Sequence, residues 1–474
     1  MRKISAFFIV FNLGLCYTIK NGENADIFKE RIMSSYKRKK TVGDTSWLVH
    51  DRFGMFIHFG LYSLPARHEW IKTMERISEE KYDVYFKHFN PDLIDCKEWA
   101  RKAKAAGMKY AVLTTKHHEG FCLFDSKYTD YTVMNTPYGK DIVKEYVDAF
   151  RAEGIKIGFY YSLLDWHHPD FPIDVIHPRR EDGEEMDKGR DMKKYAEYMR
   201  NQVTELLTNY GKIDVIWFDF SYAKNPDPVK MLAFDKGNPP PDPNKKPWMQ
   251  GNGGKGKNEW ESEELVKLVR SLQPDIVIND RLEIGGDTVT PEQSSAYSWR
   301  RDKETGEYLT WEACHTFSGS WGYFRDETSW KSHKMLIDTL IKSVAYGGNV
   351  LMNVGPTSRG VFDHRADDAL QAYADWMKYN SRSIYGCTMA EPEFTAPIGT
   401  FLTQSEEGDR LYIHLVDYPF KALVFDGLEG KVEYSQFLHD GSEILFTEKD
   451  GKVKFELPVV QPQKITPVIE VFLK

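Results

Sequence analysis

A repeated order of segments constrains the fold of this chain more than any other feature. Amphipathic stretches with helical spacing end at a glycine or proline and lead into short apolar stretches rich in β-branched residues. The pattern recurs five times, with helical stretches at 95–106, 141–153, 192–210, 263–272 and 334–345 and apolar stretches at 110–115, 155–161, 213–218, 276–278 and 350–354. Alternation of this kind is typical of a parallel sheet with helical crossovers.

Two parallel α/β architectures fit this pattern: a (β/α)8-like barrel of the TIM type and an open, doubly wound sheet. An open sheet usually carries a glycine-rich phosphate loop after its first strand. Residues 56–60, Phe-Ile-His-Phe-Gly, do not form such a loop. We therefore expect an α/β fold with a barrel over residues 31–385.

The chain changes character after about Cys387. Short stretches with strand-like alternation occur at 400–403, 410–415, 421–425 and 453–457, separated by Gly and Asp turns, and no helical pattern is present. These features predict a small antiparallel β-sandwich domain over residues 386–474.

Residues 225–257 interrupt the barrel pattern. They contain three consecutive prolines and a glycine-rich run, which indicate a long, irregular insertion. Because the insertion begins shortly after Asp219, we expect it on the face of the barrel that carries the functional residues. It is either a tolerated surface loop or a rim that shapes this face.

The N-terminal residues 1–30 have the pattern of a targeting segment. Arg2 and Lys3 precede an apolar stretch over residues 4–16, as in a short signal peptide. This predicts a secreted or periplasmic protein; the alternative is an extension without a targeting role in a cytoplasmic protein. The sequence has no apolar run of 18 residues beyond this point, so we expect no membrane partner.

Composition excludes several other classes of function. The net charge of -8 argues against a broad surface for nucleic acid. The five cysteines lack CxxC spacing, which argues against a zinc site or a disulfide framework. Aromatic residues make up 14% of the chain, a content that suits both barrel cores and sugar-binding clefts. The oligomeric state cannot be inferred from these patterns.

Polar residues at the ends of four predicted strands indicate where the chemistry lies. The apolar stretch 213–218 ends at Asp219, and the others end near His58, at His117 and His118, and at Tyr160. The carboxyl ends of strands face the active site in parallel α/β barrels. We therefore expect these side chains to share one site.

Several sequence blocks carry a resemblance to a known family. The signature blocks of α-L-fucosidases, family 29 of the glycoside hydrolases, are similar to residues 53–60, 68–70, 116–121 and 217–219. Further similar blocks are residues 105–110, 279–281, 320–323 and 347–356, so the resemblance spans about residues 47 to 392 in the right order.

The resemblance implies a retaining exo-α-L-fucosidase that hydrolyses terminal α-L-fucose through a covalent fucosyl-enzyme intermediate, without cofactor or metal. Asp219 matches the family's nucleophile. Glu292, in Thr290-Pro-Glu292, resembles the acid/base; Glu69 is the main rival and Glu312 a more distant one. Retaining glycosidases hold their two carboxyl groups about 5 Å apart.

The resemblance also implies a substrate-binding set, for which the partner is a fucosylated glycan. Its members match residues that contact the sugar: His58, Glu69, Trp70, His117, His118, Tyr160, Trp217 and Arg281. For Arg281, a structural salt bridge is the alternative. Adjacent histidines on a regular strand point to opposite faces, which argues against a metal site.

Two residues depart from the family pattern. Phe59 stands where Trp is common, and Phe220 stands where Gly or Met is frequent, so we expect a slightly altered pocket wall. Three other functions remain open at this stage: a carbohydrate-binding protein without catalysis, a hydrolase of another sugar, and a metal-dependent hydrolase. The linkage and the natural glycan are not encoded in these motifs.

Overall fold

The computed structural model describes residues 37–174, 176–180, 182, 184–223, 254–294 and 300–474. The predicted targeting segment, 1–30, and most of the predicted insertion, 225–257, lie outside the described residues. The described α-helices before residue 386 are α2 (Ser46–Asp51), α3 (Ile71–Met74), α4 (Glu79–His88), α5 (Cys96–Ala105), α6 (Ile142–Ala152), α7 (Met192–Asn209), α9 (Ser262–Leu272), α10 (His333–Ala345) and α11 (His364–Asn380). The strands are β1 (Phe53–Ile57), β2 (Tyr110–Lys116), β3 (Lys156–Ser162), β4 (Val215–Asp219), β5 (Val277–Ile278), β6 (Glu312–Thr316) and β7 (Asn349–Val354).

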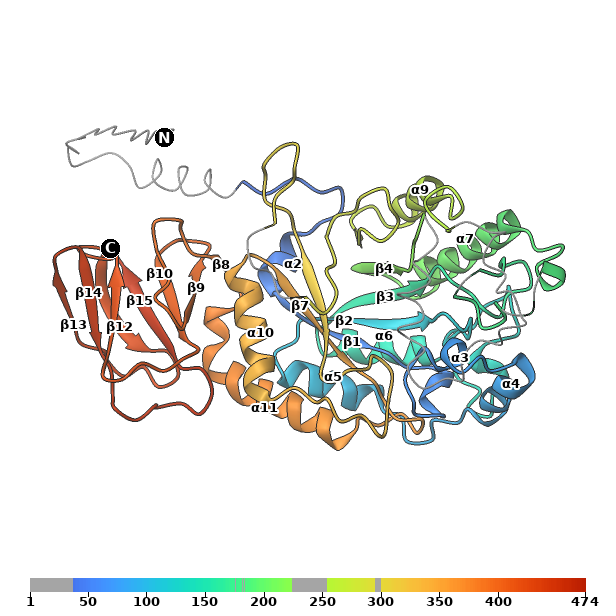
Figure 1. Ribbon diagram of the computed structural model, residues 1–474, viewed down its shortest axis with the longest axis horizontal. Helices are drawn as coiled ribbons and strands as arrows, with labels where there is room; N and C mark the ends of the chain where they lie inside the picture. Colours follow the sequence, from blue (N-terminus) through green and yellow to red (C-terminus); the bar gives the residue numbers. More distant parts are fainter. Residues whose placement is uncertain (1–36, 175, 181, 183, 224–253, 295–299) are drawn as a thin grey trace, which may run out of the picture. The chain divides into compact units, whose positions relative to one another are not determined.

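The described residues form one parallel sheet of seven strands in the order β5-β4-β3-β2-β1-β7-β6 (Figure 1). Residues 288–292, which we call the closing segment, lie between the two edge strands. Isolated parallel bridges join Thr288 to Asn279 after β5, and join Val289 to Trp311 and Glu292 to Cys314 on the β6 side. The TIM-like barrel predicted from the sequence is confirmed, with an irregular segment in the position of an eighth strand.

Burial on both faces explains why the strands read as continuous apolar runs. On β1, Phe56 belongs to the cluster inside the barrel, while Met55 and Ile57 belong to the cluster beneath the helices. On β4, Val215 and Trp217 face inward and Ile216 faces outward. This alternation is the period-2 geometry of a strand.

Capping side chains explain where four of the five predicted helices begin. The Asp95 carboxylate accepts hydrogen bonds from two backbone N–H groups in the first turn of α5. Asp141 and Asp191 cap α6 and α7 in the same way, and Ser332 caps α10. Such caps satisfy N–H groups that have no partner within the helix. The sequence patterns did not reveal helices α4 and α11 or strand β6.

The C-terminal strands form two antiparallel sheets around a separate hydrophobic cluster. The described strands are β8 (Cys387–Met389), β9 (Thr400–Ser405), β10 (Arg410–Leu415), β11 (Ala422–Asp426), β12 (Val432–Phe437), β13 (Phe446–Lys449), β14 (Lys452–Glu456) and β15 (Val468–Leu473). One sheet has the order β12-β15-β10-β9-β8 and the other β11-β14-β13. This part of the fold also agrees with the predicted β-sandwich.

Direct contacts join these sheets to helices of the barrel. The Trp376 indole of α11 donates a hydrogen bond to the Thr466 carbonyl at 3.1 Å. The rings of Tyr346, after α10, and Phe401, on β9, meet edge to face. None of the described helices has both the length and the apolar character needed to cross a bilayer.

Candidate active site

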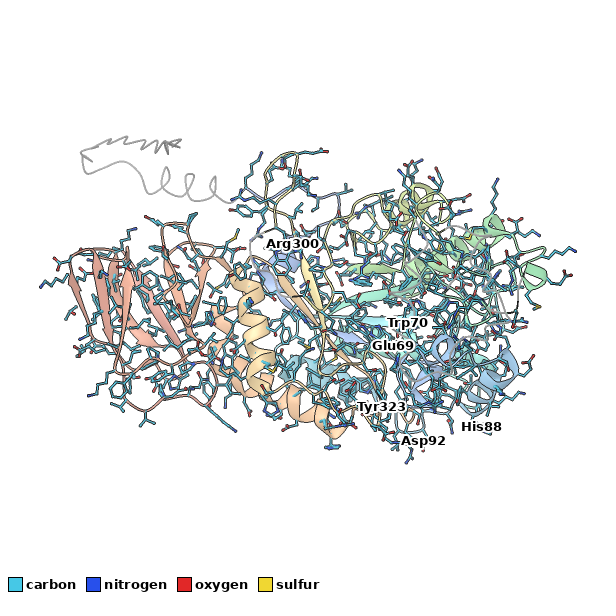
Figure 2. All side chains as sticks on the ribbon, in the orientation of Figure 1. Glu69, Trp70, His88, Asp92, Arg300 and Tyr323 are labelled. Carbon is cyan, nitrogen blue, oxygen red and sulfur yellow. The ribbon has the colours of Figure 1, made fainter. Side chains whose placement is uncertain are left out.

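A pocket opens at the carboxyl ends of the barrel strands. Figure 2 shows Glu69 and Trp70, which precede α3, close to these strand ends. The structure brings together all ten residues that the sequence predicted for the site, and four more. The lining comprises Phe56, His58, Glu69, Trp70, His117, His118, Tyr160, Trp217, Asp219, Phe220, Arg281, Glu292, Cys314 and Trp321.

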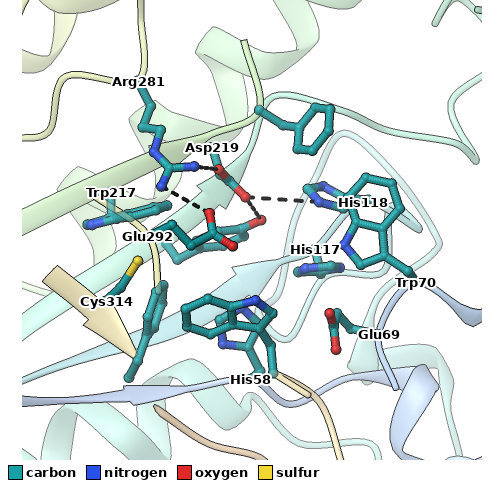
Figure 3. A pocket seen from close by; sticks show the side chains of 14 residues that line it. His58, Glu69, Trp70, His117, His118, Trp217, Asp219, Arg281, Glu292 and Cys314 are labelled. Carbon is teal, nitrogen blue, oxygen red and sulfur yellow. Dashed lines mark hydrogen bonds and ion pairs between the residues drawn. The ribbon is translucent and has the colours of Figure 1, made fainter. Parts of the chain in front are cut away.

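Asp219 ends β4 and is aimed into the pocket by the same alternation that turns Val215 and Trp217 inward. Its Oδ2 accepts a hydrogen bond from the Tyr160 hydroxyl at 2.8 Å, and its Oδ1 accepts one from Arg281 Nη1 at 3.0 Å (Figure 3). The carboxylate is thus fixed by donors on both oxygens, while its side chain keeps 15% of its surface exposed. It is held and remains accessible from the pocket.

Arg281 joins the two carboxylates that the sequence singled out for catalysis. Its Nη1 binds Asp219, and its Nη2 donates to Glu292 Oε2 at 3.1 Å. The guanidinium also lies over the Trp217 ring, 4.7 Å from its centroid, and Nη2 donates to the Thr290 carbonyl. A planar fork with several donors suits such a bridge. Arg281 therefore orients carboxylates within the pocket.

Glu292 lies on the closing segment, with Arg281 as its hydrogen-bond donor. Removal from water raises the pKa of its carboxyl, and the negative charge of Asp219 raises it further, whereas Arg281 lowers it. The net pKa is above the ordinary value for Glu. A carboxyl with a raised pKa beside an ionised one is the usual arrangement for a proton donor.

The two rival carboxylates have different surroundings. Glu69 is buried at the pocket wall, where Oε2 accepts a hydrogen bond from the Gly322 N–H at 2.7 Å. Glu312 is also buried, but it does not line the pocket and accepts a hydrogen bond from the Tyr110 hydroxyl within the barrel. Burial raises the pKa of Glu312 to about 7. Of the three, Glu292 alone shares a donor with Asp219 among the residues that the structure describes.

The proton on His58 is positioned by a chain of hydrogen bonds. Asn353 Nδ2 donates to the Trp321 carbonyl, so the Asn353 Oδ1 is left to accept from His58 Nδ1, at 2.6 Å. Burial, with a further contribution from His117, lowers the pKa of His58 well below its ordinary value. The ring is therefore neutral, and its Nε2 is an acceptor.

His118 is held in the same way by a different group. The Ser162 hydroxyl donates to the Leu164 carbonyl at 2.8 Å and therefore accepts from His118 Nδ1, at 2.7 Å. Burial lowers the pKa of His118 well below its ordinary value, and His117, His58 and Lys116 add to the effect. Its Nε2 lies 4.0 Å from Asp219 Oδ2 and is also an acceptor.

A bulge in β2 explains how His117 reaches the pocket. Thr114 pairs with Tyr160 and Lys116 with Tyr161, so Thr115 is an extra residue on β2. Lys116 then points outward and forms a buried ion pair with Asp165 at 3.1 Å. Bulges next to active sites re-aim side chains in this way. The expectation that His117 and His118 face opposite sides is wrong, because the chain leaves the regular strand at this point and both rings line the pocket.

No group of three His, Cys, Asp or Glu side chains among the described residues is arranged to hold a metal ion. The histidines of the pocket instead have Asn353, Ser162 and Glu119 beside their Nδ1 atoms. Hydrogen-bonding groups and aromatic rings line the pocket, a lining that suits a polyol.

The comparisons with known proteins agree with this geometry. The α-L-fucosidase family model matches residues 23–382. The chain belongs to the α-L-fucosidase family. It is accordingly a glycoside hydrolase with α-L-fucosidase activity.

Individual fucosidases show the extent of the likeness. α-L-Fucosidase isoenzyme 1 from Paenibacillus thiaminolyticus is 41% identical, with a TM-score of 0.81 over 91% of this chain and 98% of that one. A family 29 fucosidase from Bacteroides thetaiotaomicron, trapped as a covalent intermediate with 2-fluoro-fucosyl fluoride, is 26% identical, with a TM-score of 0.76 over 93% and 99%. The α-L-fucosidase of Dictyostelium discoideum is 25% identical over 100% of this chain and 99% of its own.

The two departures from the family pattern differ in their effect. Phe59 does not line the fucosidase pocket, because its ring packs against Phe89 and Trp99 outside the barrel; that expectation was wrong. Phe220 does line it and contacts the Trp70 ring. Its φ of +74° lies in the left-handed region, which favours glycine.

Sequence reasoning missed several side chains of this fucosidase pocket. Trp321 was quoted in a sequence block without a role, and Asn353 and Ser162 were not considered as supports for histidines. Glu119 stood inside the Lys-His-His-Glu block at 116–119 without a role. For Ser162 and Glu119 the available signal was position, since Ser162 ends the strand that carries Tyr160 and Glu119 directly follows the histidine pair after β2.

Proposed function

We propose that the enzyme is an exo-acting fucosidase that releases terminal α-L-fucose from oligosaccharides or glycoconjugates with retention of configuration. Asp219 is the nucleophile and Glu292 is the acid/base. The observation that carries this proposal is the single guanidinium of Arg281 bound to both carboxylates. Retaining enzymes need carboxyl groups about 5–5.5 Å apart, and a shared guanidinium suits such a short separation.

In the first step, Asp219 attacks the anomeric carbon while Glu292 gives its proton to the glycosidic oxygen. The carbon–oxygen bond breaks, the alcohol departs, and an ester joins fucose to Asp219. In the second step, Glu292 takes a proton from water, which attacks the same carbon and releases the Asp219 carboxylate. The Bacteroides thetaiotaomicron fucosidase trapped as a covalent intermediate supports this sequence of steps.

The pocket supplies acceptors and rings for the sugar. His58 and His118 each keep a free Nε2 acceptor for a fucose hydroxyl, and the Glu69 carboxylate accepts another. Trp70 and Trp217 provide flat apolar walls. The Tyr160 hydroxyl and Arg281 hold the nucleophile in place before attack, so the geometry is set in advance.

The raised pKa of Glu292 supports its role as the acid. Glu69 is already bonded to the Gly322 N–H, which suits an acceptor of sugar hydroxyls. Glu312 lies in the barrel beneath the pocket and does not line it.

The stereochemistry of the product tests this proposal. Hydrolysis of an aryl α-L-fucoside, followed by proton NMR, should give α-L-fucose before mutarotation, and the matched α-D-galactoside should react far more slowly. First release of β-L-fucose would rule out the double displacement.

We also propose that the enzyme is exported to the periplasm or the medium. The proposal rests on the basic and apolar order of residues 1–16. N-terminal sequencing of the mature protein from its native cells should find a start after this segment. An intact N-terminus in the cytoplasmic fraction would contradict export.

A further inference from the structure

Glu119 is a deeply buried carboxylate for which the reaction steps above have no role. It directly follows the histidine pair, and its side chain is only 1% exposed. Its Oε2 lies 3.4 Å from His117 Nδ1. Among the described residues, neither oxygen of Glu119 has a hydrogen-bond partner, and no other basic side chain lies within ion-pair range of it.

The surroundings of Glu119 are built to enclose it. A Cβ at Gly60 would lie 2.9 Å from Glu119 Oε1, so a side chain at position 60 would displace the carboxylate. Burial, and then the charge of Glu119, raise the pKa of the Tyr62 and Tyr82 hydroxyls well above the ordinary value. Both hydroxyls therefore stay protonated beside the carboxylate.

A buried carboxylate is destabilising unless a charge or hydrogen-bond donor compensates it. His117 Nδ1 is the group in position to do so. Nδ1 lies 3.4 Å from Glu119 Oε2 without a hydrogen bond between them, and His117 lines the pocket. The same arrangement recurs at the three pocket histidines, because Nδ1 of each has an oxygen beside it: an amide in Asn353, a hydroxyl in Ser162 and a carboxylate in Glu119.

We propose that Glu119 is a positioning residue that holds the His117 imidazole, with a proton on Nδ1, so that Nε2 is presented to a fucose hydroxyl. The proposal rests on the proposed substrate-binding role of His117. Groups that fix the proton and the orientation of a functional imidazole act through it and do not touch substrate. Glu119 supplies no proton to the reaction.

A double-mutant cycle on an aryl α-L-fucoside tests the proposal. H117A alone should lower kcat/KM about tenfold to a hundredfold, since a buried hydrogen bond to substrate is lost. E119Q keeps the shape but provides an amide that can turn, and it should lower kcat/KM about tenfold or more. In the H117A background, E119Q should change kcat/KM less than twofold, because the residue it positions is absent.

E205Q is the matched control. Glu205 is another buried carboxylate, bonded to Ser126 Oγ at 2.8 Å, and it does not line the pocket. This variant should lose thermal stability while keeping kcat/KM within twofold of the parent enzyme. Its behaviour separates loss of a buried carboxylate in general from loss of the one beside His117.

The outcomes distinguish the two proposals. Equal losses from E119Q in both backgrounds, or parental kcat/KM for E119Q, overturn the role of Glu119. A parental kcat/KM for H117A instead overturns the binding role of His117. If E119Q does not fold, nitrogen NMR of the parent enzyme labelled at histidine decides, and the spectrum of H117A identifies the signal of His117. A proton on Nδ1 supports the proposal. A neutral ring with its proton on Nε2 overturns it.

Discussion

Strand β4 and the closing segment deliver the two proposed catalytic carboxylates in different ways. β4 pairs along its whole length with β3, and Asp219 accepts hydrogen bonds from two side chains. The closing segment is joined to its neighbours by isolated bridges, and Glu292, with 45% of its side chain exposed, has Arg281 as its one side-chain donor among the described residues. A nucleophile needs one fixed line of attack, whereas an acid/base must serve first the leaving group and then water.

The two regions also share a feature. Phe220 follows Asp219 with φ of +74°, and Gln293 follows Glu292 with φ of +47°. Non-glycine residues in this region are strained by roughly 1–2 kcal/mol each, and such strain collects at functional sites. Both segments therefore adopt a left-handed backbone conformation just after the carboxylate.

The largest expected effect is that of Asp219→Gly. Turnover should fall by about 10⁴- to 10⁶-fold, because no other group forms the ester. Steady-state kinetics on an aryl α-L-fucoside check this, and added azide should give the β-L-fucosyl azide by direct displacement. The control is Asp214→Asn: Asp214 lies just before the other end of β4 and binds the Ile157 N–H, so this variant should lose stability but keep its kcat.

Glu292→Ala should lose about 10²- to 10⁴-fold on alkyl fucosides, whose leaving groups need protonation. Activated aryl fucosides should lose much less in the first step, and azide should rescue the second step to give the α-L-fucosyl azide. The β-azide from Asp219→Gly and the α-azide from Glu292→Ala would therefore distinguish the nucleophile on β4 from the acid/base on the closing segment. Equal losses on both substrates without rescue would transfer the acid/base role to Glu69.

Arg281→Lys should reduce kcat/KM by roughly tenfold to a hundredfold, because a single ammonium cannot bridge both carboxylates as the fork does. The active form has Glu292 protonated, so activity is lost as pH rises through its pKa. Arg281 lowers that pKa. A loosened bridge therefore raises it, and the alkaline limb of the kcat/KM profile should move to higher pH. An unmoved or lower limb would contradict the assignment of that limb to Glu292.

The smallest effects are expected at the two strained residues. Phe220→Gly and Gln293→Gly each relieve roughly 1 kcal/mol of backbone strain but lose contacts: the ring packing on Trp70, and the hydrogen bond from Gln293 to Thr316. The melting temperature of each variant should therefore differ from that of the parent enzyme by only a few degrees. Kinetics should separate the two variants, with KM rising for Phe220→Gly and alkyl fucosides affected most by Gln293→Gly. Identical kinetic profiles for the two variants would contradict the different roles of β4 and the closing segment.

The difference between β4 and the closing segment also explains which site residues could be predicted from the sequence. β4 is a continuous buried run that ends in a carboxylate, so periodicity alone located Asp219 at a strand end. The closing segment has neither alternation nor a long apolar run, and only a family resemblance pointed to Glu292. The supporting residues Asn353 and Ser162 were missed because their roles depend on hydrogen bonds between segments distant in sequence. The bulge at Thr115 was missed because one extra residue leaves no mark on composition.

The most direct test of the proposed mechanism is to identify the residue that carries the covalent intermediate. The enzyme is treated with 2-deoxy-2-fluoro-α-L-fucosyl fluoride, digested with pepsin and examined by tandem mass spectrometry. We expect one fluorofucosyl ester, on Asp219, and none in Asp219→Gly. A label on Glu292 or Glu69 would contradict the assignment of Asp219 as the nucleophile, and with it the different roles of β4 and the closing segment.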